Sequence, residues 1–175
     1  MILPIVTYGD PILRKQGYSI KEKTKELDEL INNMFETLHH TDGIGLAAHQ
    51  VGRPLSLFVI NYDRDPSYLK EVFINPIIIE SSVEEVDYPE GCLSVPGIME
   101  IITRPKSITI KYLDQDFNQK EVTYEDILAR VIEHEYDHIM GRLFIDKLIP
   151  LKKKILSGKL KNIMKKKFSI NYRTK

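Results

Sequence analysis

The sequence predicts an α+β fold, with antiparallel β-sheets packed around a central helix, an N-terminal amphipathic helix and a basic C-terminal helix. Three observations lead to this class. Strand-like segments fill the middle of the chain, helical periodicity flanks them on both sides, and strands and helices do not alternate as they do in parallel sheets. We expect a single domain over residues 1–175, because a chain of this length can bury a sizeable core.

The first helix is predicted from residue 25. Its apolar residues recur at helical spacing between charged and polar ones: Leu27, Leu30, Ile31, Met34 and Leu38. Thr24 is the expected N-cap, and the helix should end near Gly43, where glycine lets the backbone turn. Residues 12–20 are expected to be irregular, because Asp10-Pro11 is typical of a turn and Gly17 interrupts any period.

Strands are expected next, at residues 55–60, 72–79, 81–87, 97–103, 107–113 and 119–123. Residues 114–118 form a turn that joins the last two strands into an antiparallel hairpin. Asn75-Pro76 and Arg104-Pro105 should lie at edges or bulges, because proline cannot donate to the ladder. Residues 89–97, which are punctuated by proline and glycine, are expected to be a loop of the kind that carries function.

Two further helices complete the prediction. One begins after Thr123, with Asp126 in a capping-box arrangement, and ends near Met140 before Gly141. Apolar residues cover much of its circumference, so it should be central and buried. The other spans residues 151–167, with lysines around an expected apolar stripe made of Ile155, Leu156, Leu160, Ile163 and Met164.

The charge is divided unevenly along the chain. Residues 151–175 hold ten of the 25 basic residues and no acidic residue, so residues 1–150 carry 15 basic and 25 acidic residues. Such a division favours contact between the basic segment and a polyanion. We expect a cytoplasmic protein, because the N-terminal residues do not resemble a signal or transit peptide, the chain has a single cysteine, and no segment is apolar enough to span a membrane.

His134-Glu135-Tyr136-Asp137-His138 is the strongest indication of chemistry. Histidines four residues apart on a helix lie on one face and can bind the same metal ion, while Glu135 can act as a general base. A catalytic site needs a third ligand and an open position. No histidine follows His138, and Phe144 stands where some metalloproteases have a third histidine. The third ligand must therefore lie upstream or be Asp146.

Several upstream residues are candidates for this ligand: Cys92, His39, His40, His49 and a number of acids. Cys92 is the best of them, because it lies in the segment rich in proline and glycine and because a thiolate suits iron, zinc or cobalt. His39 and His40 end the first helix, where histidine also suits the negative end of the helix dipole.

Three ordered segments resemble the peptide deformylase family: GIGLAAHQ at residues 43–50, EGCLS at 90–94 and HEYDH at 134–138. No motif position departs from the family pattern, and His49 fills a variable position. The resemblance implies a hydrolase that removes the formyl group from the N-terminal formyl-methionine of new polypeptides, releasing formate. It also implies one metal ion on Cys92, His134 and His138 with water as a fourth ligand. That metal is usually Fe(2+), and nickel, cobalt or zinc can substitute.

The same resemblance assigns the catalytic roles. Glu135 moves the proton, while the Gln50 amide and the Leu93 backbone N–H stabilise the oxyanion. Ile44, Ile127 and Val131 are expected to line an apolar slot for the substrate methionine, with core packing an equal alternative for Ile127. Residues 43–45, with glycine at both ends, should let the peptide bind alongside as an added strand.

Two expectations concern residues outside the motifs. Asp137 is expected to anchor its helix by pairing with an arginine, and Arg104 is a candidate. Some family members use a basic C-terminal helix to dock on the ribosome, and residues 151–175 suit that contact. The same lysines are explained equally well by a helix that packs through its apolar stripe and keeps a solubilising lysine face in water. We expect neither membrane nor specific DNA binding.

Two other functions compete with this interpretation. A small metalloprotease is disfavoured by the missing downstream ligand. A non-enzymatic RNA- or ribosome-binding protein with a structural metal would need a fourth protein ligand, because structural sites are normally closed.

Overall fold

The computed structural model of the chain describes residues 1–64 and 67–175, and its strands form two antiparallel sheets. The larger sheet has the order β1-β2-β3-β6-β7, from Gly45–Ala47, Leu57–Arg64, Ser67–Ser81, Ser107–Leu113 and Gln119–Glu125. The smaller sheet pairs β4 (Glu85–Cys92) with β5 (Val95–Pro105). The predicted α+β class with antiparallel sheets is confirmed. Among the described residues, no helix is both long and apolar enough to cross a lipid bilayer.

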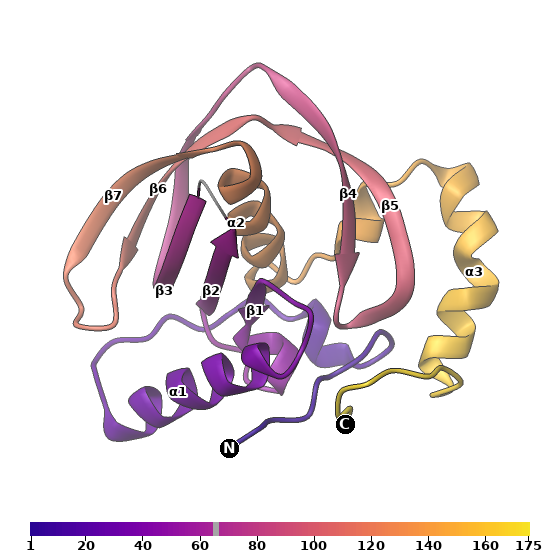
Figure 1. Cartoon of the computed structure of the whole chain (residues 1–175), viewed down its shortest axis with the longest axis horizontal. Helices are drawn as coiled ribbons and strands as arrows, with labels where there is room; N and C mark the ends of the chain where they lie inside the picture. The colour runs from indigo at the N-terminus through magenta and orange to yellow at the C-terminus, as the bar shows by residue number, and fades with distance from the viewer. Residues whose placement is uncertain (65–66) are drawn as a thin grey trace.

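A helix covers each face of the larger sheet. Alternate residues of β2 point to opposite faces: Leu57 and Val59 pack with α1 (Lys25–His39), whereas Phe58 and Ile60 pack with α2 (Asp126–Ile139). Figure 1 shows the consequence: α2 runs between the larger sheet and the β4–β5 hairpin, which arches over it. The predicted buried position of this helix is confirmed.

The ends of α1 and α2 follow from local sequence. The Thr24 side chain accepts a hydrogen bond from the Leu27 N–H at 3.2 Å, as predicted for an N-cap. Gly141 follows α2 with φ +72°, a left-handed conformation that suits glycine. The predicted capping box before α2 is wrong, because Thr123 lies in β7 opposite Thr109 and the N-cap is Glu125.

The segment predicted as a loop at residues 89–97 is mostly strand. Only Leu93 and Ser94 turn between β4 and β5, and a register shift at Gly91 and Cys92 bends β4 there. Proline is tolerated at positions 89 and 96 because both strands of a two-stranded sheet are edge strands. Pro76 lies within β3 at a predicted bulge, between the pairs made by Ile74 and Ile77.

Other strand boundaries differ modestly from the prediction. The expected strand at 81–87 is divided, since β3 ends at Ser81 and β4 begins at Glu85. The short strand β1 was not predicted. A 3-10 helix occupies Pro11–Arg14 in the segment expected to be irregular. The turn at 114–118 joins β6 and β7 as an antiparallel hairpin, as predicted.

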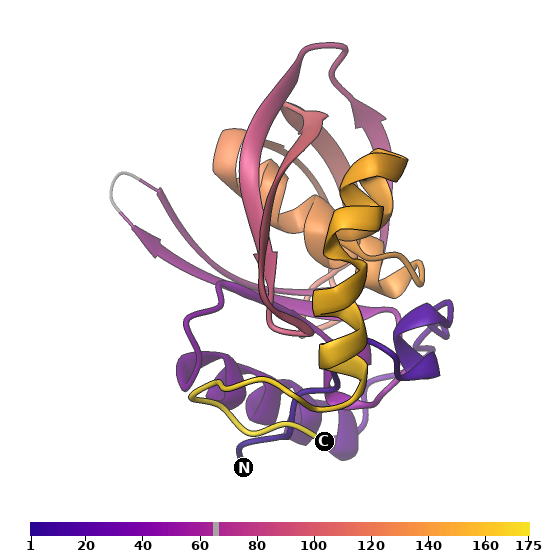
Figure 2. The same cartoon turned by 90° about the vertical axis from the view of Figure 1, so that its right-hand side faces the viewer.

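The C-terminal helix α3 (Pro150–Met164) lies beside the β4–β5 hairpin, outside the rest of the fold. Figure 2 shows α3 in front of that hairpin. Leu156 and Ile163 are buried against β5 residues and the 3-10 helix Phe144–Lys147. Ile155 and Met164, by contrast, are 71% and 55% exposed. The predicted stripe was therefore too wide, because residues 155 and 164 lie about 80–100° away from Leu156 around the helix.

Candidate active site

Three metal-ligating side chains meet between α2 and the β4–β5 turn. Cys92, His134 and His138 each offer one ligand atom, and these atoms lie within 4.8 Å of one another. The Cys92 Sγ is 3.2 Å from the His138 Nε2. Bond lengths of about 2.0–2.3 Å to a shared ion would place tetrahedral ligand atoms about 3.3–3.8 Å apart. The arrangement therefore fits a single ion of that size.

The remaining candidates for the third ligand lie elsewhere. His39 and His40 are exposed at the end of α1. Asp146 forms an ion pair with Arg14 at 2.5 Å and accepts a hydrogen bond from the Leu143 N–H. His49 is fully buried, and neither ring nitrogen has a hydrogen-bond partner among the described residues. Burial lowers the pKa of His49, which favours the neutral form of its ring.

Glu90 orients His134 for metal binding. Its carboxylate accepts a hydrogen bond from the His134 Nδ1 at 2.9 Å, which leaves the Nε2 of that ring to face Cys92. A carboxylate behind a histidine ligand fixes the tautomer and the ring orientation. Burial alone would raise the pKa of Glu90, but the hydrogen bonds from His134 and Arg104 hold it well below its usual range.

Two buried arginines complete this network. Arg104 donates to both oxygens of Glu90, at 2.6 and 3.0 Å, and to Asp137 at 2.7 Å. Arg130 donates to Glu90 at 2.7 Å and to the backbone oxygen of Ile102 at 2.8 Å. The predicted pairing of Asp137 with Arg104 is confirmed. Neither Glu90 nor Arg130 was given a role from the sequence, although Glu90 begins the EGCLS segment and Arg130 shares a helix face with His134, four residues on.

Glu135 is buried beside the backbone of β1. Burial raises the pKa of Glu135 to about 7, and one of its carboxylate oxygens has no hydrogen-bond partner among the described residues. A Cβ atom at Gly45 would lie 2.5 Å from the Glu135 Oε1. Glycine is therefore required at position 45, because any larger residue would displace the carboxylate.

The Gln50 side-chain amide is held in one orientation. Its Oε1 accepts a hydrogen bond from the Ala47 N–H at 2.8 Å, so the Nε2 points the other way, to 3.3 Å from the Ser94 Oγ and 3.6 Å from the Cys92 Sγ. Gln50 is only 1% exposed. The amide donor is thus aimed at the ligand cluster by groups that are themselves fixed.

These residues open onto a cavity of about 720 Å³, a size typical of ligand sites. The cavity wall includes every pocket residue expected from the sequence: Gly43, Ile44, Gly45, Ile127 and Val131. Leu93, Cys92, His134 and Glu135 also line it. Two residues of the C-terminal segment, Ile170 and Tyr172, line it as well, and no feature of the sequence pointed to them.

Comparison with known proteins gives a consistent result. Residues 2–154 match the family described as polypeptide deformylase. The chain is 45% identical to the peptide deformylase of Christiangramia forsetii, over 99% of this chain and 95% of that protein. It is 44% identical to the peptide deformylase of Flavobacterium johnsoniae, over 100% of this chain and 96% of that one.

Solved structures of peptide deformylases are also similar to this chain. A peptide deformylase from Legionella pneumophila has a TM-score of 0.86 at 38% identity, covering 94% of this chain and 96% of that chain. A peptide deformylase from Ehrlichia chaffeensis, crystallised with actinonin, has a TM-score of 0.88 at 34% identity, covering 96% of this chain and 99% of that one.

Proposed function

The chain belongs to the polypeptide deformylase family, and from this premise we propose how its residues perform the family's reaction. It is a metal-dependent hydrolase that removes the formyl group from the N-terminal methionine of new polypeptides. Cys92, His134 and His138 are the proposed ligands of the metal ion. The observation that carries this proposal is the meeting of their ligand atoms within 4.8 Å at the wall of a large cavity.

The proposed metal is one Fe(2+) ion, for which nickel, cobalt or zinc can substitute. One thiolate and two imidazoles suit all four metals. A divalent ion held there supplies Lewis acidity, polarising a carbonyl group and lowering the pKa of water. The buried carboxylate of Glu90 behind His134 supports the assignment, because histidine ligands commonly have such a partner.

Glu135, Gln50 and Leu93 are proposed to act on the reacting groups. Glu135 takes a proton from the attacking water and later gives it to the leaving amine, a role that suits a buried carboxyl group whose pKa is raised by burial. The Gln50 Nε2 and the Leu93 N–H donate hydrogen bonds to the oxyanion that forms as the formyl carbon becomes tetrahedral. The fixed orientation of the Gln50 amide supports its part in this scheme.

The substrate peptide is proposed to extend along residues 43–45. Among the described residues, β1 is the end strand of the larger sheet and pairs with β2, so the outer edge at Gly45 is available for an added strand. Backbone hydrogen bonds there would give affinity that does not depend on the substrate sequence. Ile44, Ile127 and Val131 are proposed to enclose the methionine side chain.

Metal content tests the ligand set directly. Anaerobically purified protein should hold one ion per chain, and Cys92→Ala or His134→Ala should abolish binding at equimolar metal. Glu135→Gln should retain the ion, because Glu135 is not a proposed ligand. Full metal content in both ligand variants would contradict the assignment.

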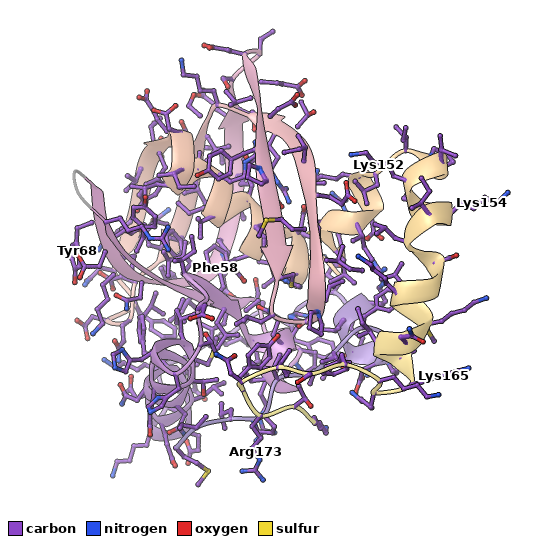
Figure 3. The ribbon with its side chains drawn as sticks, turned by 45° about the vertical axis from the view of Figure 1, so that its right-hand side comes forward. Phe58, Tyr68, Lys152, Lys154, Lys165 and Arg173 are labelled. Atoms are coloured by element: carbon purple, nitrogen blue, oxygen red, sulfur yellow. The ribbon has the colours of Figure 1, made fainter. Side chains whose placement is uncertain are left out.

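We further propose that the protein is cytoplasmic, that residues 1–175 are one domain, and that residues 151–175 contact the ribosome. Exposed lysines on α3 and directly after it support the last point. Figure 3 shows Lys154 and Lys165 pointing away from the rest of the molecule. Lys152 is instead bound to Glu100 at 2.9 Å.

A further inference from the structure

The C-terminal residues 168–175 return from the end of α3 to the cavity. Lys166 has φ +56°, and the Lys167 N–H donates to the Asn162 oxygen at 2.8 Å, which reverses the chain after the helix. The Ile5 N–H then donates to the Arg173 oxygen, and the Lys175 N–H to the Ile5 oxygen, both at 2.9 Å. The segment is thus anchored near both ends. Figure 2 shows it in yellow, looping away from the base of α3 and back to a C-terminus near the N-terminus.

Tyr172 joins this segment to the proposed oxyanion donor. Its hydroxyl donates to the Leu93 backbone oxygen at 2.7 Å, and its ring lines the cavity with Ile170. A Cβ atom at Gly43 would lie 2.9 Å from the Leu93 Cδ1, so Gly43 and Leu93 are close neighbours. The C-terminal segment therefore lies at the part of the cavity wall formed by Leu93 and Gly43.

The Leu93–Ser94 turn is held by hydrogen bonds from separate parts of the chain. Besides the bond from Tyr172, the Tyr8 N–H donates to the Ser94 oxygen at 2.7 Å, and the Gln50 Nε2 lies 3.3 Å from the Ser94 Oγ. The Leu93 carbonyl and N–H flank the same Cα atom, so fixing the carbonyl restricts rotation of the N–H. Oxyanion donors must be held in place before the reaction to stabilise its transition state.

We propose that residues 168–175 form part of the substrate site. Tyr172 is a positioning residue that holds the Leu93 N–H toward the reacting formyl group, and Ile170 is an apolar wall against the bound peptide. This inference rests on the proposed role of Leu93. The segment lies outside residues 2–154, the part of the chain that the family model matches.

Kinetics of two variants separate these roles, using the metal-loaded protein and a formyl-methionyl tripeptide. Tyr172→Phe keeps the ring and removes the hydrogen bond, so kcat should fall about three- to tenfold with KM unchanged. Ile170→Ala removes wall area, so KM should rise about three- to tenfold with kcat unchanged. Tyr18→Phe is the matched control, because Tyr18 is 64% exposed and lies outside the cavity wall.

Deuterium exchange provides a readout besides activity. Exchange in a peptide covering residues 90–97 should be faster in Tyr172→Phe than in the wild-type protein or in Tyr18→Phe, whether or not formate is released. A wild-type protein without formate release would refute the proposed mechanism and leave the exchange result to decide the positioning role. Unchanged exchange with unchanged kcat in Tyr172→Phe would overturn the inference. A loss of kcat in Tyr172→Phe that is fully explained by a loss of bound metal would also overturn the inference.

Discussion

Glu135 is the residue on which the proposed proton transfer depends. Its carboxyl group is buried, and a cation at the three ligands would favour the charged form that can accept a proton. We expect Glu135→Gln to retain the ion and to lower kcat for formate release by about 10²–10⁴-fold, the usual contribution of a general base. A stopped assay at saturating formyl-methionyl peptide measures this. A variant within threefold of wild type would show that Glu135 does not move the proton.

Gly45 affects the position of the Glu135 carboxylate because it has no side chain to occupy the same space. A Cβ atom there would lie 2.5 Å from the Glu135 Oε1, so Gly45→Ala should lower kcat at least tenfold by displacing the base. Gly158→Ala is the matched control, because nothing lies within 4 Å of a Cβ atom at this helical position. The control should gain about 0.5–1 kcal/mol of stability without a kinetic change. Equal kinetics in the two variants would contradict this explanation of Gly45.

At the scale of single residues, the sequence was most informative where spacing within one helix decides the geometry. His134 and His138 share a face because they are four residues apart, and Arg104 was a candidate partner of Asp137. Cys92 was the best candidate for the third ligand by its segment and its thiolate chemistry, and the family motif supported that choice. The roles of Glu90 and Arg130 depend on the approach of β4 to α2, and local sequence patterns do not encode such an approach.

The buried ionic network is the feature that fixes α2 against the β4–β5 hairpin. Arg104 on β5 bonds Asp137 on α2 and Glu90 on β4, and its side chain is 1% exposed. We expect a double-mutant cycle of Arg104→Met and Asp137→Asn to give a coupling energy of about 1–3 kcal/mol in urea unfolding. The exposed pair Lys106–Glu84 is the control, and should couple by less than about 1 kcal/mol. Equal coupling in the two pairs would show that Arg104 does not anchor the helix through Asp137.

At the scale of elements, the spacing of apolar residues predicted secondary structure better than the content of proline and glycine did. The helices and most strands follow from repeating apolar residues, whereas proline and glycine at 89–97 indicated a loop. The structure forms strands there because a two-stranded sheet consists only of edges, where proline removes no ladder bond that is needed. The short strand β1 escaped prediction because its apolar run is too brief to show alternation.

The uneven distribution of charge along the chain predicts which part of the molecule binds a polyanion. Lys154 and Lys159 on α3 and Lys165 directly after it are exposed, so replacing all three with glutamate should weaken ribosome binding about tenfold or more at low salt. Hydrolysis of small formyl peptides should not change. Cosedimentation at several salt concentrations measures the binding. Glutamate at Lys21, Lys25 and Arg53, which are also exposed, is the control, and an equal effect would contradict docking through α3.

Substitution of lysines tests docking better than deletion of residues 151–175 does, because the fold brings the C-terminal residues back to the cavity. Deleting residues 151–175 would also remove Ile170 and Tyr172 from the cavity wall and the pairing of the chain end with Ile5. The sequence showed that this segment is basic, but it did not predict that the end of the chain returns to the cavity. That path depends on a reversal after α3 and on contacts with residues more than 70 positions away.

Formate release from a formyl-methionyl peptide is the most direct test of the metal site as the centre of the reaction. The protein would be purified anaerobically, stripped, and reloaded with Fe(II) or Ni(II), with Cys92→Ala treated in parallel. We expect formate release that depends on the metal in the wild-type protein and is abolished in Cys92→Ala. Equal release by the metal-free protein, or by Cys92→Ala, would contradict this expectation.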